Sequence, residues 1–246
     1  MFSPAPFSQA PYSEAPPPEP LRPLVRCLWR SAPRGPQRIV PDGCLDLVAG
    51  DGEVFVAGPD TGAWSSLTAP GAVLHGLRFR PGAAAGVLGV AADELRDTRV
   101  PLAELWGHEG AVLAAQVLDG TLSLADVARR RPAEPDPAVT AVVAHLERGP
   151  SRVGALPAPL GQQQRYEQQL GKRQLGERQL RRRFTIAVGY GPATYLRVTR
   201  FQRAIAAAPR STGLAELAAT AGYADQAHLA RDCRALTGLT PSAYFS

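Results

Sequence analysis

Residues 38–80 alternate between short apolar runs and clusters of turn-forming residues. The runs are Ile39–Val40, Leu45–Val48 and Val54–Ala57, separated by Pro41-Asp42-Gly43 and Gly50-Asp51-Gly52. Further along, Leu77 and Phe79 alternate with Arg78 and Arg80, as in a strand with one buried face. Both patterns are typical of strands joined by hairpins, so we predict a β-rich core in this part of the chain.

From Ala83 to Leu118 the pattern becomes helical, because leucines and valines recur at helical spacing among Ala, Glu and Asp. Residues 129–135 are charged and interrupted by proline, and Asp136-Pro137 then supplies a helix N-cap with proline in the first turn. We therefore predict an α+β protein with a boundary near residue 135. Its predicted parts are a flexible Pro- and Ser-rich tail at 1–20, a small β-rich N-terminal domain with helices at 21–135, and an all-α domain at 136–246.

Two short amphipathic helices around Gly222 give the strongest signal. Their inner faces are lined by Leu214, Leu217, Ala218 and Ala221 on the first helix and by Leu229, Cys233 and Leu236 on the second. Gly222 permits the sharp turn between them, and Asp225 is placed to cap the second helix. The residues left on or near the outer face of its first turns, where a helix-turn-helix reaches base edges, are Gln226, Ala227, His228, Ala230 and Arg231.

This segment resembles the second helix-turn-helix of AraC-type transcription regulators. The match lies in Gly222-Tyr223, the cap at Asp225 and the terminal Gly238-Leu-Thr-Pro-Ser-Ala-Tyr244. Cys233 departs from the family pattern, since members usually have phenylalanine there. The resemblance implies a sequence-specific DNA-binding regulator whose two helix-turn-helix units, joined by a linker helix, enter successive major grooves.

The segment 177–201 is similar to the first recognition helix and the linker helix of the same family. Leu180 and Phe184 are four residues apart and face inward. The linker helix is expected from about Pro192 to Ala208, roughly 25 Å at 1.5 Å per residue. The DNA-contacting residues that we predict in this unit are Arg178, Gln179, Arg181 and Arg182.

The scaffold helix of the first unit departs from the family pattern. Pro157 and Pro159 interrupt the apolar positions of residues 153–161, and prolines break helices. An insertion at about residues 162–174 then precedes the recognition helix, where a turn of about four residues is expected. The sequence therefore leaves open whether the first unit is intact.

Four segments of the N-terminal half carry a second resemblance: Pro41–Leu47, Ala57–Pro59, Phe79–Gly82 and Pro101–Gly107. They are similar to a small domain often found in front of AraC-type DNA-binding domains. The resemblance implies sensing or dimerisation, so a small-molecule effector and a homodimer are both open.

Charge is divided unevenly along the chain. Residues 151–246 contain 14 Lys or Arg and 5 Asp or Glu, a net charge of +9. The remaining residues contain 13 and 17, a net charge of −4. Because duplex DNA is a dense polyanion, this division favours double-stranded DNA as the partner of the C-terminal part.

A different class of function would place chemistry in the N-terminal half. Asp42, Cys44 and Asp46 with His75 could form the site of an enzyme, or of a repair protein whose cysteine accepts an alkyl group, with the helical half as a DNA-binding tether. Both need an activated thiol, and no evident base lies near Cys27 or Cys44 in the sequence. Asp42 is explained by a hairpin turn and Asp46 by the solvated face of a strand. We therefore expect no enzymatic activity.

The remaining candidate chemistry is sparse. Four scattered histidines and three widely separated cysteines predict neither a metal site nor a cofactor. Trp64 and Trp106 are interpreted as core residues. The chain shows no signal peptide and no apolar run near the roughly 20 residues of a membrane helix, so we expect a cytoplasmic protein with reduced thiols.

Overall fold

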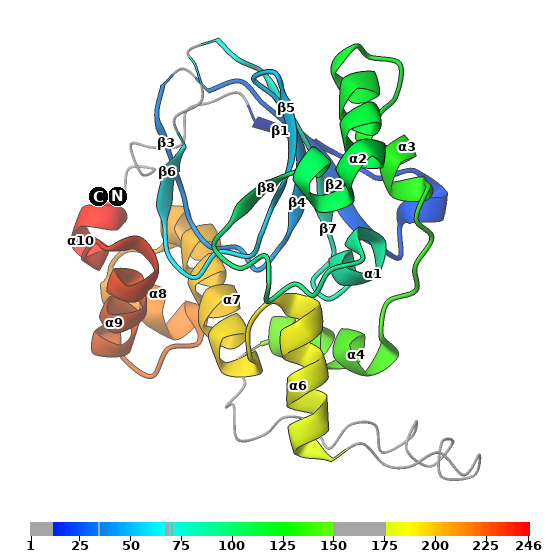
Figure 1. The fold of residues 1–246 in the computed structure, drawn as a ribbon. Coiled ribbons are helices and arrows are strands. Elements are labelled where there is room, and N and C mark those ends of the chain that lie inside the picture. Colours follow the sequence, from blue (N-terminus) through cyan, green and yellow to red (C-terminus); the bar gives the residue numbers. More distant parts are fainter. Residues whose placement is uncertain (1–11, 34, 67–68, 70, 150–175) are drawn as a thin grey trace.

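The computed structural model describes residues 12–33, 35–66, 69, 71–149 and 176–246. It confirms the predicted α+β fold, because a β-rich N-terminal part with helices is followed by a helical C-terminal part (Figure 1). Within these residues, no helix has the length and apolar character that a membrane crossing needs.

A six-stranded antiparallel sheet forms the centre of the N-terminal part. In spatial order its strands are β1 (Tyr12–Ala15), β2 (Val25–Ser31), β7 (Leu74–Phe79), β4 (Asp46–Gly50), β5 (Glu53–Ala57) and β8 (Arg99–Pro101). The turn between β4 and β5 has positive φ at Asp51 (56°) and Gly52 (79°), as the favoured two-residue hairpin turn requires. The hairpin predicted at Gly50-Asp51-Gly52 is therefore confirmed. A separate two-stranded sheet pairs β3 (Gln37–Ile39) with β6 (Trp64–Ser66).

Alternation along the strands divides the large sheet into two faces. Leu47, Val56 and Leu77 are fully buried on one face, beneath α1 (Ala84–Leu88), α2 (Leu102–Leu118, kinked at Gly107) and α3 (Leu124–Arg129). Asp46 and Arg78 lie on the opposite face. The β3–β6 pair lies over that second face, away from the three helices (Figure 1). A cavity between the two sheets results.

We predicted a flexible tail at residues 1–20, and this prediction is wrong for residues 12–20. Tyr12–Ala15 pairs with Leu28–Ser31 of β2, and the Tyr12 ring lies 6.2 Å from that of Trp29. A short 3-10 helix at Glu19–Leu21 then buries Leu21 in the core. Composition alone missed these contacts because the partner strand is contributed by residues outside the tail. Residues 1–11 lie outside the described residues.

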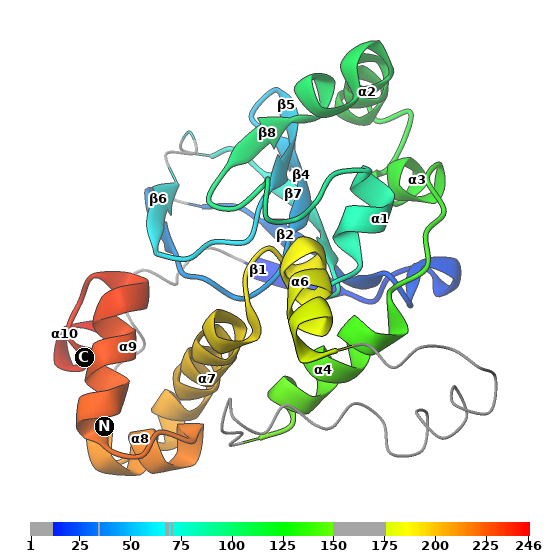
Figure 2. The same cartoon turned by 60° about the horizontal axis from the view of Figure 1, so that its bottom comes forward.

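The C-terminal part consists of helices packed around a second core. They are α4 (Pro137–Glu147), α6 (Glu177–Val188), α7 (Pro192–Ala207), a 3-10 turn at Ala208–Arg210, α8 (Leu214–Ala221), α9 (Gln226–Thr237) and α10 (Pro241–Tyr244). The linker helix predicted from Pro192 to Ala208 is confirmed as α7. Figures 1 and 2 both show α7 in the middle, with α6 on one side and α9 on the other.

The two cores are separate but touch. One cluster of buried side chains runs from Leu21 to Ala128 and the other from Val139 to Phe245. They meet where Gly43, at φ 85°, lies so close to α7 that an added Cβ would be 2.9 Å from the Tyr195 ring. Glycine is needed at this position because it supplies both the positive φ and the space.

Candidate functional site

The pair α8 and α9 forms the helix-turn-helix predicted around Gly222. Gly222 ends α8 in the left-handed region at φ 86°, and its N–H donates to the carbonyls of Ala218 and Ala219. The Asp225 carboxylate accepts a hydrogen bond of 2.6 Å from the N–H of His228, as an N-cap does. Both local features therefore fix the start and direction of α9.

The predicted contact residues of α9 differ in how far they reach solvent. Gln226, Ala227 and Arg231 are exposed, whereas His228 and Ala230 are half-buried. The His228 ring packs edge-on against Tyr223 with centroids 5.0 Å apart, and its Nε2 lies 3.3 Å from the guanidinium of Arg200. The imidazole is thus engaged within the domain.

A buried carboxylate within α9, that of Asp232, was not predicted from the sequence. Asp232 is only 8% exposed, lies 3.5 Å from Arg197 of α7, and lies 3.9 Å from His228. Burial raises the pKa of Asp232, while Arg197 acts in the opposite direction. The feature of the sequence that could have indicated this pair is the i,i+4 spacing of His228 and Asp232. The ion pair ties α9 to α7, so it helps to orient the recognition helix.

The first unit presents a more basic surface. Leu180, Phe184 and Val188 are buried on one side of α6. The predicted contact residues Arg178, Gln179, Arg181 and Arg182 are all exposed, and Arg181 pairs with Glu177 at 2.7 Å. The expected scaffold helix with Pro157 and Pro159, and the insertion at 162–174, lie outside the described residues.

Removal of the α9 cap tests the role of Asp225 in holding the second unit. We expect Asp225→Ala to lower the free energy of unfolding by about 1 kcal/mol, because the N–H of His228 loses its acceptor. Asp225→Ser should lower it much less, since a serine oxygen accepts the same bond. Urea unfolding of both variants measures the difference, and equal losses would contradict the capping role.

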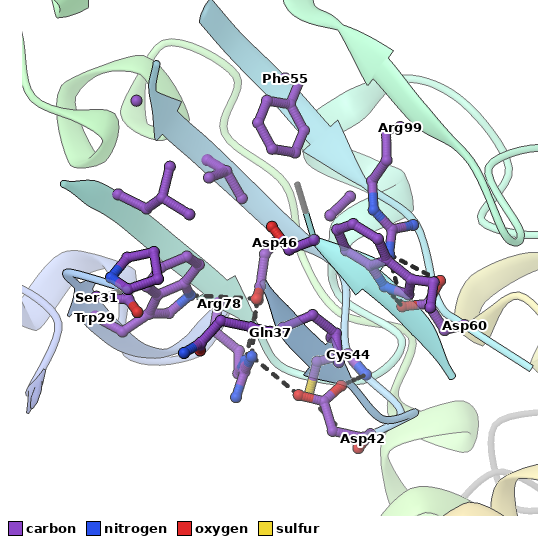
Figure 3. A pocket seen from close by; sticks show the side chains of 18 of the residues that line it. Trp29, Ser31, Gln37, Asp42, Cys44, Asp46, Phe55, Asp60, Arg78 and Arg99 are labelled. Carbon is purple, nitrogen blue, oxygen red and sulfur yellow. Dashed lines mark hydrogen bonds and ion pairs between the residues drawn. The ribbon is translucent and has the colours of Figure 1, made fainter. Parts of the chain in front are cut away.

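The cavity in the N-terminal part is a second candidate site. It has a volume of about 420 Å³ and lies between the β3–β6 pair and the face of the large sheet that is turned away from α1, α2 and α3. Figure 3 shows Trp29, Asp46, Arg78 and Asp60 around it. Asp46 is 9% exposed, so its interpretation as a solvated strand residue is wrong. Trp64, which we expected in the core, lines this cavity.

Ion pairs organise the polar side of the cavity. The Arg78 guanidinium lies 2.9 Å from Asp42 and 2.8 Å from Asp46, and Trp29 donates to Asp46 at 3.2 Å (Figure 3). Burial raises the pKa of Asp46, although the ion pair with Arg78 opposes this rise. A second pair joins Asp60 to Arg99 at 2.7 Å.

The structure brings together only part of the thiol or acid–base site considered from the sequence. Asp42, Cys44 and Asp46 line the same cavity. His75 is exposed on β7. It is three residues from Arg78, an odd number, so its side chain lies on the opposite face of the sheet from Arg78 and Asp46. Burial raises the pKa of the Cys44 thiol well above its usual value, which opposes formation of the reactive thiolate. Within the described residues, no group of three or more metal-ligating side chains is found.

Two family models match the chain. Residues 172–246 match a helix-turn-helix domain, and residues 13–101 match a domain of unknown function, DUF6597. Together with the capped pair of α8 and α9, the first match defines a DNA-binding protein of the helix-turn-helix class. The domain is of the AraC type, and the protein is a DNA-binding transcription regulator. The alternative of an enzyme or alkyl-acceptor repair protein is not favoured.

Solved structures of one protein are also similar. The crystal structure of ToxT from Vibrio cholerae O395 is 9% identical, with 89% of this chain and 95% of that chain covered and a TM-score of 0.41. A second ToxT crystal structure, bound to (E)-4-(8-methylnaphthalen-1-yl)but-3-enoic acid, is 9% identical, with 95% and 98% covered and a TM-score of 0.43. No curated protein matches the chain in sequence.

Proposed function

We propose that α6 and α9 are the two recognition helices and that they enter successive major grooves on one side of the duplex. The 16 residues of α7 separate them, a length of about 24 Å at 1.5 Å per residue. Successive major grooves lie about 34 Å apart, so a linker of this length with a helix packed at each side fits that spacing. The net charge of +9 beyond residue 150 supplies attraction to phosphates.

We further propose different roles for the two helices. Gln226 at the capped end of α9 and Arg231 in the middle of that helix are exposed, and these side chains can pair bidentately with adenine and guanine. Ala227, His228 and Ala230 complete the surface that faces the base edges. In α6, Arg178, Gln179, Arg181 and Arg182 mainly contact phosphates. The observation that carries the proposal is the exposed outer face of α9 beginning at the Asp225 cap.

Site selection from random duplex DNA tests these roles. Gln226→Ala and Arg231→Ala should relax base preference at one or two operator positions, at a cost of about 1 to 3 kcal/mol for the preferred sequence. Arg182→Ala should weaken binding to every sequence. It should also reduce by about one the slope of the logarithm of the binding constant against the logarithm of the salt concentration. Arg80→Ala, an exposed arginine of the N-terminal part, is the matched control and should change neither. If the Gln226 and Arg231 variants keep the wild-type base preference, the proposed roles are wrong.

We propose that the N-terminal part of the protein regulates DNA binding by the C-terminal part. We assign residues 21–135, together with the strand β1 that pairs with them, to a sensing domain and residues 136–246 to the DNA-binding domain. Support comes from the two separate cores and from the cavity beside the first of them, on the other face of the large sheet. Dimerisation through the N-terminal domain stays a prediction. As a transcription regulator, the protein would act in the cytoplasm, and the proposal requires neither a cofactor nor a reaction.

A further inference from the structure

The charges that line the cavity do not balance. The acidic residues are Asp42, Asp46, Asp51, Glu53 and Asp60, and the basic residues are Arg78 and Arg99. Each guanidinium is already paired with carboxylates, Arg78 with two and Arg99 with one. Negative charge is therefore in excess along the lining. A ligand carboxylate would be repelled there, whereas a protonated amine would be attracted.

The rest of the lining is suited to a flat or apolar body. Trp29, Phe55 and Trp64 lie around the cavity together with Val48 and Leu74. The volume of about 420 Å³ falls within the roughly 300–1,000 Å³ usual for sites that hold small molecules. The cavity can therefore enclose a ligand the size of an indole with a short side chain.

The β3–β6 side of the cavity also holds the last turn of α9. Ala63, next to the cavity residue Trp64, donates its N–H to the carbonyl of Leu236 at 2.7 Å. The side chain of Arg38, between the cavity residues Gln37 and Ile39, donates to the carbonyl of Thr237. Movement of either strand would thus be transmitted to the second recognition helix.

The other recognition helix is held by a neighbouring segment. Ala92 donates its N–H to the carbonyl of Ile186 in α6 at 2.7 Å, and Arg96 donates to the carbonyl of Gly189 at 2.7 Å. This segment is joined to the cavity wall, because Asp97 accepts a hydrogen bond of 2.6 Å from the N–H of Thr61. The ion pair between Asp60 and Arg99 ties the same two segments together. The ends of both helices are therefore attached to one wall of one cavity.

We propose that the cavity binds a small molecule with a protonated amine on an aromatic or apolar body, and that this ligand changes the placement of α6 relative to α9. The amine lies near Asp42 and Asp46, and the body packs against Phe55 and Trp64. The first half of the proposal concerns the cavity alone, and the second rests on the proposed DNA-binding function.

Two probes of matched size and opposite charge test the ligand class. Tryptamine should bind the full chain in calorimetry, and indole-3-propionic acid should bind at least about tenfold more weakly. Asp42→Asn should weaken tryptamine binding about tenfold, whereas Glu104→Gln, which removes an exposed carboxylate outside the cavity, should not. Equal binding of the two probes, or no binding of tryptamine, overturns this half. The comparison of probes on the wild-type chain stands even if Asp42→Asn does not fold.

A DNA-binding measurement tests the effect on the helices. Saturating tryptamine should change the affinity for a selected operator duplex about fivefold or more, and the operator should change tryptamine affinity by the same factor. Arg38→Ala should keep tryptamine binding but reduce this factor, because it releases one attachment of α9. An unchanged operator affinity with tryptamine bound overturns the second half. Failure of the chain to bind any duplex, with tryptamine binding intact, would instead overturn the proposed function.

Discussion

The affinity of the full chain for duplex DNA should fall about a hundredfold when salt is raised from 50 to 200 mM. Four exposed arginines on α6 and α9 are available for phosphates: Arg178, Arg181, Arg182 and Arg234. Each phosphate that a cation neutralises releases counterions, so about four contacts give a loss of about 10² over this range. Fluorescence anisotropy with labelled duplex across a salt series measures the slope.

The same series separates the two halves of the protein. Arg182→Ala and Arg178→Ala should each reduce the slope by about one, while Arg80→Ala should leave it unchanged. A slope near zero in the wild-type chain, or an equal reduction by Arg80→Ala, would show that phosphate contacts are not made by the helical part.

Arg78→Ala should lower the free energy of unfolding by about 3–5 kcal/mol. The substitution leaves the nearly buried Asp46 carboxylate without its cation, and an uncompensated buried charge is costly. Replacement of both residues, Asp46→Leu with Arg78→Leu, should restore most of the loss, because neither charge then remains. Arg80→Ala, two residues along the chain and exposed, is the control for loss of an arginine from this strand end. Chemical denaturation of the four proteins measures the coupling.

The Arg78→Ala variant should also depend on pH in a defined direction. The pKa of Asp46 is raised by burial in the folded chain, and loss of Arg78 removes the interaction that opposes this rise. The folded state then binds a proton more tightly than the unfolded state does. The contribution of Asp46 to stability is therefore greatest below the ordinary aspartate pKa and is lost as pH rises through the raised value. Denaturation of the variant and of the wild-type chain at pH 4 and pH 7 tests this. The stability that the variant loses relative to wild type should be larger at pH 7, and a larger loss at pH 4 would contradict the assignment.

The helix-turn-helix could be predicted from the sequence because its determinants are local. Gly222 and Asp225 fix the turn and the cap within four residues, and the inner faces of α8 and α9 follow from helical spacing. The linker helix was predicted to within one residue for the same reason. The roles of the predicted DNA-contacting residues remain predictions.

The cavity could not be predicted, because it depends on pairing between distant residues. Asp46 was interpreted as solvated because its strand alternates, but alternation cannot show that a second sheet covers that face. That sheet forms when Gln37 pairs with Ser66. The two residues are far apart in the sequence, so the local pattern around either one does not predict their pairing. The strand at Tyr12–Ala15 was missed in the same way, since only its pairing with β2 orders it.

Two of the bonds that hold the recognition helices have an evolutionary consequence. They run from the N–H groups of Ala63 and Ala92 to carbonyls of Leu236 and Ile186, so they join main chain to main chain. Every residue type except proline offers the same N–H. The side chain at position 63 can therefore diverge among descendants of this chain while its bond persists, whereas burial of Ala92 in the core keeps position 92 small. Selection for the junction itself would be visible as an avoidance of proline at positions 63 and 92.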